Sequence, residues 1–229
     1  AHIITAKYWH NIHNGSLHLT LADTGWGKAV WGKFYGQMLA GGAVFIYDYE
    51  GAFKPADLLK VMQDNHVTSF CAPPTIYRFL IREDISAYDL SALEYCTTAG
   101  EALNPSVFTE WKKKTGIMIY ESYGQTETTL VVGSFPWITP KPGAMGVRTP
   151  QYDIDILNDE GKPTKPMEHG ELVIKVSEKR PLGLFKGYYR DDDLTAERIK
   201  DVYYSTGDIV YRDEAHYLWL VPRSDQVLK

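Results

Sequence analysis

The chain has 229 residues, of which 44% are hydrophobic, so it can bury a core in one large domain or two smaller ones. Its formal net charge of -5 leaves no basic surface for a phosphate backbone, which excludes nucleic acid as a first expectation. No apolar run approaches the ~20 residues of a membrane span, and no signal-peptide pattern precedes the first residues, so we expect a cytoplasmic protein.

Segments with helical and strand-like patterns alternate in the first half of the chain. Apolar residues at helical spacing predict helices over residues 31–39, 55–65, 75–82 and 105–115, and short apolar runs predict strands over 43–47, 67–71, 93–98 and 117–120. Asn104 followed by Pro105 is typical of a helix start, and Gly116 of a helix end. The alternation predicts an α/β fold, a mostly parallel sheet with helices on its faces.

The pattern changes near Pro142 and Gly143. Polar and apolar residues alternate over 153–157, a turn follows at 158–161, and a further strand is predicted over 170–175. After a short helix over 192–200, predicted strands over 208–211 and 217–221 flank a tight turn. These hairpin signals predict a small antiparallel β-barrel or curled sheet. We therefore expect an α/β subdomain over residues 1–149 and an antiparallel β subdomain over 150–221.

Residues 120–128, YESYGQTET, end a predicted buried strand with a hydroxyl and a carboxylate on neighbouring residues. The Glu127 carboxylate is a hard oxygen ligand suited to Mg2+, and the Thr126 hydroxyl can hydrogen-bond phosphate oxygens. Parallel sheets bind ligands outside the carboxyl ends of their strands, where residues 99–101 also lie. The two segments are therefore expected to converge on one site.

Three further segments suggest groups that bind a nucleotide. Gly100 follows a predicted strand and would let a flat base approach the backbone closely. Gly207 permits a tight turn before Asp208, whose carboxylate could accept hydrogen bonds from two ribose hydroxyls. Arg223 is suited to phosphate or ribose oxygens. Each residue taken singly also fits an ordinary turn or a solvated surface charge, so the prediction depends on their combination.

Taken in this order, the four segments resemble the nucleotide-binding motifs of the adenylate-forming superfamily, and the chain is similar to the AMP-forming acyl-CoA synthetases, above all the medium-chain ones. Residues 71–78, CAPPTIYR, resemble the acyl-pocket motif of that family, and residues 22–26, ADTGW, resemble the start of its acyl and pantetheine wall. The resemblance implies ATP, Mg2+ and CoA as cofactors. It also implies a two-step reaction, in which a small carboxylic acid and ATP give acyl-AMP and pyrophosphate, and the CoA thiolate then displaces AMP.

The resemblance also implies roles for individual positions. Thr126 would hold the α-phosphate and Glu127 the Mg2+, which makes them the catalytic pair, while Asp208 would bind the ribose hydroxyls. Asp225 would be the hinge of a segment, residues 222–229, that leads to a C-terminal domain. The implied nucleotide-binding residues are Gly100, Glu101, Ala102, Glu121, Ser122, Tyr123, Gly124, Gln125, Thr126, Asp208 and Arg223.

The acyl pocket is expected to be large. Acetyl-CoA synthetases place a tryptophan where this chain has Gly124, and its ring closes their acyl pocket. Without that ring there is room for several methylenes, each worth ~0.8 kcal/mol when buried. The resemblance therefore implies medium-chain, branched or aryl acids rather than acetate, with Trp26, Thr75 and Ala99 as further wall residues.

The resemblance is incomplete at both ends of the chain. The phosphate loop of the family is expected before Ala1 and its C-terminal domain after Lys229, so we expect an internal piece of a longer enzyme that alone turns over ATP negligibly. At the hinge, Pro222 stands where the family usually has glycine. Two alternatives stay open, a non-catalytic nucleotide- or acyl-binding module and an adenylation domain that loads a carrier protein. The sequence indicates no oligomeric state.

Overall fold

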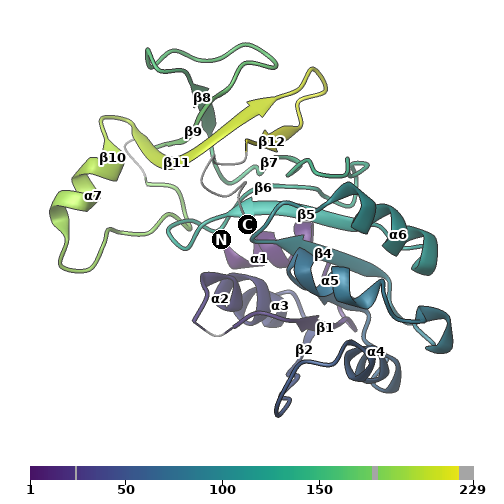
Figure 1. The fold of residues 1–229 in the computed structure, drawn as a ribbon. Coiled ribbons are helices and arrows are strands. Elements are labelled where there is room, and N and C mark those ends of the chain that lie inside the picture. Colours follow the sequence, from purple (N-terminus) through teal and green to yellow (C-terminus); the bar gives the residue numbers. More distant parts are fainter. Residues whose placement is uncertain (24, 177–179, 222–229) are drawn as a thin grey trace.

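The computed structural model describes residues 1–23, 25–176 and 180–221, and the strands of these residues form two sheets (Figure 1). The strands of sheet A are β1 (Leu17–Thr20), β2 (Ala43–Phe45), β3 (Ser69–Cys71), β4 (Tyr95–Ala99), β5 (Ile119–Gly124), β6 (Leu130–Gly133) and β7 (Val147–Arg148). Those of sheet B are β8 (Ile154–Leu157), β9 (Gly170–Lys175), β10 (Ile199–Lys200), β11 (Tyr203–Arg212) and β12 (Leu218–Leu220).

Sheet A has the order β2-β1-β3-β4-β5-β6-β7, and its strands are parallel from β2 to β5 and antiparallel from β5 to β7. Sheet B has the order β10-β11-β9-β8, with β12 beside β11, and is antiparallel throughout. The predicted fold, a mostly parallel sheet followed by a curled antiparallel one, is confirmed. The change of sheet falls between Arg148 and Ile154.

Helices connect the parallel strands, as the alternating pattern predicts. The connecting helices are α2 (Gly27–Lys33), α3 (Tyr35–Leu39), α4 (Pro55–Asp64), α5 (Pro74–Leu80), the 3-10 helix η2 (Ile85–Ala87) and α6 (Pro105–Thr115). The helix α1 (His2–Ile4) and the π-helix η1 (Thr5–Trp9) precede β1, and α7 (Asp192–Arg198) lies in the sheet B part. The Asn104 side chain caps α6 by accepting a hydrogen bond from the Ser106 N–H, and Gly116 ends the helix with φ 78°. No helix in the described part of the chain is long and apolar enough to span a membrane.

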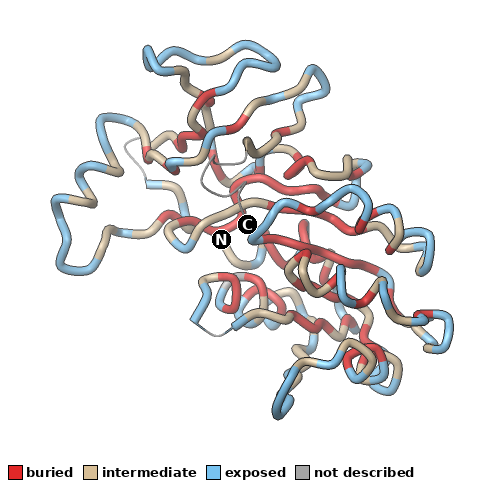
Figure 2. The backbone as a smooth tube through the Cα atoms, viewed as in Figure 1, coloured by how far each residue is buried: buried red, intermediate tan, exposed pale blue. Residues whose placement is uncertain are grey.

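Both faces of sheet A are buried, as expected for parallel strands. Neighbouring residues of one strand belong to different clusters: Phe70 packs with α4, α5 and α6, whereas Cys71 packs with Trp9. A further cluster joins Val132 of β6 to Leu172 of β9, so the two sheets share a core. Figure 2 shows buried residues concentrated along the central strands of sheet A.

The helix predicted over residues 31–39 is wrong in its bounds. It starts earlier, at Gly27, and it breaks at Phe34, where φ is -121° and ψ is -76°, so α2 and α3 are separate helices. A Cβ on Gly36 would lie 2.3 Å from the His2 carbonyl oxygen, so α3 packs backbone to backbone against α1. Its apolar side chains are left outside, with Met38 60% and Leu39 67% exposed.

The tight turn predicted before Asp208 is a bulge inside a strand. β11 runs without a break from Tyr203 to Arg212, and its pairing with β9 shifts register between Ser205 and Ile209. Gly207 lies in this irregular stretch with φ 74°, a conformation that glycine adopts without strain. The bulge turns Asp208 toward sheet A, where Tyr123 and Gln125 bind its carboxylate.

Candidate active site

A pocket of about 230 Å3 lies where the carboxyl ends of β4 and β5 meet the bulge of β11. We call it the Asp208 pocket. Its lining residues are Gly100, Glu101, Ala102, Glu121, Ser122, Tyr123, Gly124, Gln125, Met145, Asp208 and Leu220. The structure therefore brings together all the nucleotide-binding residues expected from the sequence except Thr126 and Arg223.

Hydrogen bonds across the two sheets fix the Asp208 carboxylate. The Tyr123 hydroxyl donates to Asp208 Oδ2 at 2.5 Å, and Gln125 Nε2 donates to the same oxygen at 2.8 Å. The Tyr204 hydroxyl in turn donates to Gln125 Oε1 at 2.8 Å. Burial, and then the charge of Asp208, raises the pKa of Tyr123, so its phenol remains a donor at neutral pH. No described residue donates to Asp208 Oδ1, which leaves that oxygen for a ligand hydroxyl.

Glu121 is a buried carboxyl group in the same pocket. It is 4% exposed, its Oε1 accepts a hydrogen bond from the Leu103 N–H at 3.1 Å, and its Oε2 has no partner among the described residues. Burial raises the pKa of Glu121 to about 8, although the bond from Leu103 acts in the opposite direction. The side chain is therefore mostly protonated at neutral pH.

A second pocket, of about 320 Å3, shares Gly100, Gly124 and Gln125 with the first. We call it the Lys28 pocket, and its lining residues are Gly25, Trp26, Gly27, Lys28, Ala99, Gly100, Gly124, Gln125 and Thr126. Three of the expected acyl-wall residues line it: Trp26, Ala99 and Gly124. Thr75 lines neither pocket, and its hydroxyl donates to Glu101 Oε2 at 3.2 Å.

Two glycines shape the wall that the pockets share. Gly100 has φ 101°, and a Cβ there would lie 3.7 Å from the ring of Trp26, so the indole lies against this backbone. A Cβ on Gly124 would lie 2.2 Å from the carbonyl oxygen of Thr129, because the pairing of β5 with β6 is irregular beside it. A side chain at position 124 would therefore force the backbone to move. The sequence-based interpretation considered Gly124 only as an open pocket floor and did not include this contact with the backbone.

Thr126 and Glu127 lie at the edge of the Lys28 pocket. Thr126 is exposed and lines that pocket, while Glu127 lines neither pocket and accepts a hydrogen bond from the Tyr188 hydroxyl at Oε1, 2.9 Å away. The described residues include no group of three or more His, Cys, Asp or Glu that could hold a metal ion. A single carboxylate beside a hydroxyl fits Mg2+ whose other ligands are substrate phosphates and water. Arg223 and the proposed hinge residue Asp225 lie outside the described residues.

Sequence reasoning missed Lys28, Met145 and Leu220 as lining residues. Lys28 is 5% exposed, and its Nζ donates a hydrogen bond to the Ala99 carbonyl oxygen at 3.1 Å. A lysine two positions after Trp26, at the start of a helix that is apolar up to Lys33, was the available signal. Met145 and Leu220 come from a loop and a short strand that carry no motif.

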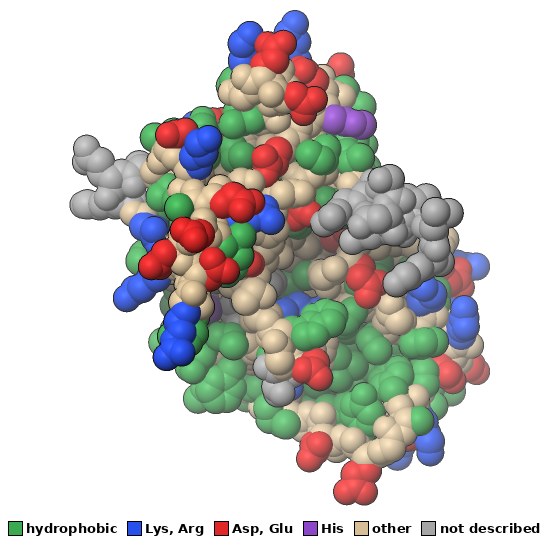
Figure 3. Space-filling view, turned by 60° about the vertical axis from the view of Figure 1, so that its left-hand side comes forward, with side chains coloured by type: hydrophobic (Ala, Val, Ile, Leu, Met, Phe, Trp, Pro, Cys, Tyr) green, Lys and Arg blue, Asp and Glu red, His purple; other side chains and the backbone are tan. Residues whose placement is uncertain are grey.

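Two larger pockets lie outside these two. One, of about 590 Å3, also includes Trp26 and reaches Pro73 and Ile76 of the expected acyl-pocket motif. The other, of about 450 Å3, lies on sheet B around Asp155 and Arg212 and shares no residue with the Asp208 or Lys28 pocket. Hydrophobic side chains gather on the lower part of the face in Figure 3, below a hollow in the surface.

Comparison with known families and proteins gives one consistent match. Residues 3–189 match the model of the AMP-binding enzymes. The chain is 43% identical to 4-hydroxybutyrate–CoA ligase 1 of Metallosphaera sedula over 95% of its own length and 38% of that protein. It is 37% identical to mouse acyl-coenzyme A synthetase ACSM3, mitochondrial, over 98% of its own length and 39% of that protein. The chain thus spans about two fifths of the length of the curated relatives it matches.

Solved structures give the same fold. The acyl-CoA synthetase of Brucella canis superposes with a TM-score of 0.86 at 28% identity, covering 98% of this chain and 41% of the other. The anthranilate CoA ligase AuaEII, solved with anthranoyl-AMP, superposes with a TM-score of 0.85 at 25% identity, covering 98% of this chain and 43% of the other.

Proposed function

The chain belongs to the AMP-binding enzyme family, and we propose that the protein that carries it joins a small carboxylic acid to CoA through an acyl-adenylate. The observation that carries this proposal is the Asp208 pocket, in which segments up to 120 residues apart, from Gly100 to Leu220, form one cavity with a fixed carboxylate at Asp208. The relatives named as CoA ligases and acyl-CoA synthetases support the same reaction class.

In this proposal the Asp208 pocket holds the nucleoside and the Lys28 pocket holds the acid. Gly100 and the following two residues would lie on one face of the adenine and residues 121–123 on the other, while Asp208 Oδ1 would accept hydrogen bonds from the ribose. Thr126 would position the α-phosphate at the edge of the Lys28 pocket. The carboxylate oxygen would then attack the α-phosphorus and release pyrophosphate, and the CoA thiolate would attack the acyl carbon and release AMP.

Glu127 would hold Mg2+, which when bound neutralises phosphate charge. The Tyr188 hydroxyl would orient the Glu127 carboxylate through its hydrogen bond. Acids larger than acetate are expected because the Lys28 pocket, at about 320 Å3, has no side chain at position 124 to fill it. The division into subdomains over residues 1–149 and 150–221, the hinge over 222–229, the cytoplasmic location and the inactivity of these 229 residues alone remain proposals.

The test measures acid-dependent exchange of pyrophosphate into ATP by the protein that carries this chain, with acetate, butyrate, octanoate and benzoate. Exchange with at least one larger acid, followed by thioester formation when CoA is added, is the expected result. Nucleotide binding without exchange for any acid would favour the non-catalytic module instead. Exchange without a CoA thioester would favour the domain that loads a carrier protein.

Glu127→Gln tests the proposed metal ligand in the same assay. Because the amide keeps the shape but loses the charge, kcat/KM should fall by about a hundredfold, and excess Mg2+ should restore it only in part. Tyr188→Phe is the matched control, since it removes the hydrogen bond to Glu127 but keeps the carboxylate. Equal losses in the two variants would assign the effect to that hydrogen bond, whereas unchanged kinetics in Glu127→Gln would remove Glu127 from the metal site.

A further inference from the structure

Lys28 brings a positive charge to the wall of its pocket. Its side chain is 5% exposed, and the one hydrogen bond shown for it runs from Nζ to the Ala99 carbonyl oxygen. Among the described residues, no carboxylate lies within the 4.0 Å ion-pair distance of Nζ. An ammonium group carries three N–H donors, so Lys28 has donor capacity beyond the Ala99 bond.

A buried cation without an anion is costly, and the protein keeps one here. Burial lowers the pKa of Lys28 from its ordinary value, although Cys71 and the more distant Glu101 carboxylate act in the opposite direction. Of the nine residues that line the pocket, Lys28 is the one with an ionisable side chain. An acceptor for its remaining donors is therefore expected from a ligand in the pocket.

The side chains behind Lys28 are polar but supply no negative charge. A Cβ on Gly32 would lie 3.2 Å from Lys28 Cγ and 3.5 Å from His10 Nε2, so Gly32 lies against both side chains. His10 is fully buried, its Nδ1 lies 2.9 Å from Thr97 Oγ1, and its Nε2 has no partner among the described residues. Burial, and then the neighbouring His18 and Lys28, lowers the pKa of His10 well below its ordinary value, so the imidazole is neutral.

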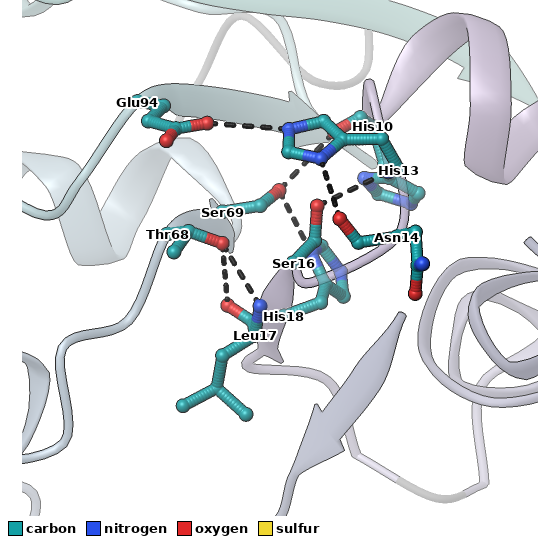
Figure 4. Close-up of polar contacts among 9 residues, drawn as sticks. All are labelled: His10, His13, Asn14, Ser16, Leu17, His18, Thr68, Ser69 and Glu94. Atoms are coloured by element: carbon teal, nitrogen blue, oxygen red, sulfur yellow. Dashed lines mark hydrogen bonds and ion pairs between the residues drawn. The ribbon is translucent and has the colours of Figure 1, made fainter. Parts of the chain in front are cut away.

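His18 extends this neutral polar layer. Its Nδ1 lies 2.9 Å from Ser69 Oγ, and the same hydroxyl donates to the His10 carbonyl oxygen, so Ser69 lies between the two histidines (Figure 4). Burial lowers the pKa of His18 to about 3, so it too is uncharged. No anion reaches Lys28 from this side, and its preferred partner has to come from the pocket.

We propose that Lys28 selects the acid, by pairing with an oxygen at the end of the substrate remote from the reacting carboxylate. The proposal rests on the function proposed above. Thr126, where that carboxylate would react, and Lys28 line the same pocket, and Trp26 gives an apolar wall. The substrate class is therefore a short acid with a terminal hydroxyl or a second carboxylate, rather than a plain alkyl acid.

The experiment compares kcat/KM for acids of matched size, 4-hydroxybutyrate against pentanoate and succinate against butyrate, in the wild-type protein and in Lys28→Met. A hydrogen bond to a charged group is worth about a tenfold to hundredfold preference, so the wild type should favour at least one oxygen-bearing acid by that factor. Lys28→Met should abolish the preference and leave the alkyl acid within about threefold of wild type. The two pairs distinguish a neutral terminal oxygen from an anionic one.

Lys7→Met, at an exposed lysine of η1 that lines none of the pockets described above, is the matched control and should keep the wild-type selectivity. Thermal unfolding of both variants shows whether they fold, and Lys28→Arg, which keeps the charge, should retain part of the preference. An equal loss for all four acids would overturn the proposal, because Lys28 would then hold the reacting carboxylate or only the fold. Equal kcat/KM of the wild type for all four acids would also overturn the role of Lys28, but it would leave the proposed acyl-CoA synthetase reaction standing. If no acid supported pyrophosphate exchange, the proposed reaction itself would be overturned.

Discussion

The Asp208 pocket and the Lys28 pocket share Gly100, Gly124 and Gln125 but differ in how their polar groups are satisfied. In the first, side chains of both sheets bind one another, and Asp208 accepts two hydrogen bonds at one oxygen. In the second, Lys28 binds one backbone carbonyl oxygen and no side chain of the described residues. The protein itself thus orients the polar groups of the Asp208 pocket. The Lys28 ammonium, in contrast, lacks a further partner among the described residues, and a ligand can supply one.

The difference indicates which half of the site is fixed and which is adjustable. A network that holds its groups in place before binding suits a ligand that is the same in every reaction cycle, because little ordering remains to be done. A buried cation beside apolar walls instead distinguishes ligands by whether they carry an acceptor. On the proposed function, the constant ligand is the nucleotide and the discriminated ligand is the acid.

Asp208→Asn should break the fixed half and give the largest effect. The amide cannot accept hydrogen bonds as strongly from Tyr123, Gln125 and a ribose hydroxyl, so the KM for ATP and the Kd for AMP should rise by about tenfold to a hundredfold. The factor should be the same for every acid. Steady-state kinetics at several acids and calorimetry with AMP measure it.

Asp155→Asn is the matched control for that change. Asp155 accepts a hydrogen bond from the Tyr203 hydroxyl at 2.9 Å, much as Asp208 does from Tyr123, but it lies outside both pockets. Nucleotide affinity should be unchanged in this variant. A loss that depends on the acid in Asp208→Asn would contradict the division between a fixed half and an adjustable half.

Gly124→Ala tests a residue that belongs to both pockets, with a smaller effect. Because a Cβ would lie 2.2 Å from the Thr129 carbonyl oxygen, the backbone has to shift. We expect a loss of ~1–3 kcal/mol in the free energy of unfolding and a fall of about tenfold in kcat/KM for short and long acids alike. Denaturant unfolding and kinetics with acetate, butyrate and octanoate check this, and a loss confined to octanoate would show that Gly124 acts only through pocket depth.

The sequence predicted which residues of the fixed half come together because they lie in contiguous segments at strand ends. Gly100 follows β4 and residues 121–125 end β5, and neighbouring parallel strands bring their carboxyl ends together. The position of Asp208 was also predicted, but not the reason for it, since the bulge of β11 depends on pairing with β9. Register shifts of this kind depend on both strands and leave no clear local pattern.

The adjustable half was predicted less well because it depends on packing between distant segments. Lys28 reaches Ala99, 71 residues later, from a helix whose position is set by its packing on β1, α3 and η1. The sequence analysis inferred a large acyl pocket because position 124 lacks a side chain. The close approach of Gly124 to the Thr129 carbonyl oxygen depends instead on the register of β5 and β6. The break at Phe34 likewise reflects the contact of Gly36 with His2 and not the apolar spacing of residues 31–39.

Glu121→Gln sharpens the comparison with the smallest effect, because Glu121 Oε2, like Ser122 Oγ, is a buried atom of the Asp208 pocket that lacks a partner among the described residues. The pKa of Glu121 is about 8 in the folded protein against an ordinary value of 4.5, so folding takes up a proton between these values. Stability from wild-type Glu121 is fully present below pH 4.5 and is lost as the pH rises toward 8, by at most ~1.4 kcal/mol per pH unit. The amide does not titrate, so the free energy of unfolding of the variant should rise relative to that of the wild type as the pH increases from 4.5 to 8.

Denaturant unfolding of wild type and Glu121→Gln at pH 5, 6, 7 and 8 measures that gain, with Glu101→Gln, at an exposed carboxylate of the same pocket, as the matched control. The free energy difference between Glu121→Gln and wild type should grow from pH 5 to pH 8, while the bond from the Leu103 N–H is kept by the amide oxygen. Parallel curves at all four values would mean that the Glu121 carboxylate is satisfied by a group outside the described residues. The Glu121 carboxylate would then be held by the protein, as the Asp208 carboxylate is, and the contrast with Lys28 would be stronger.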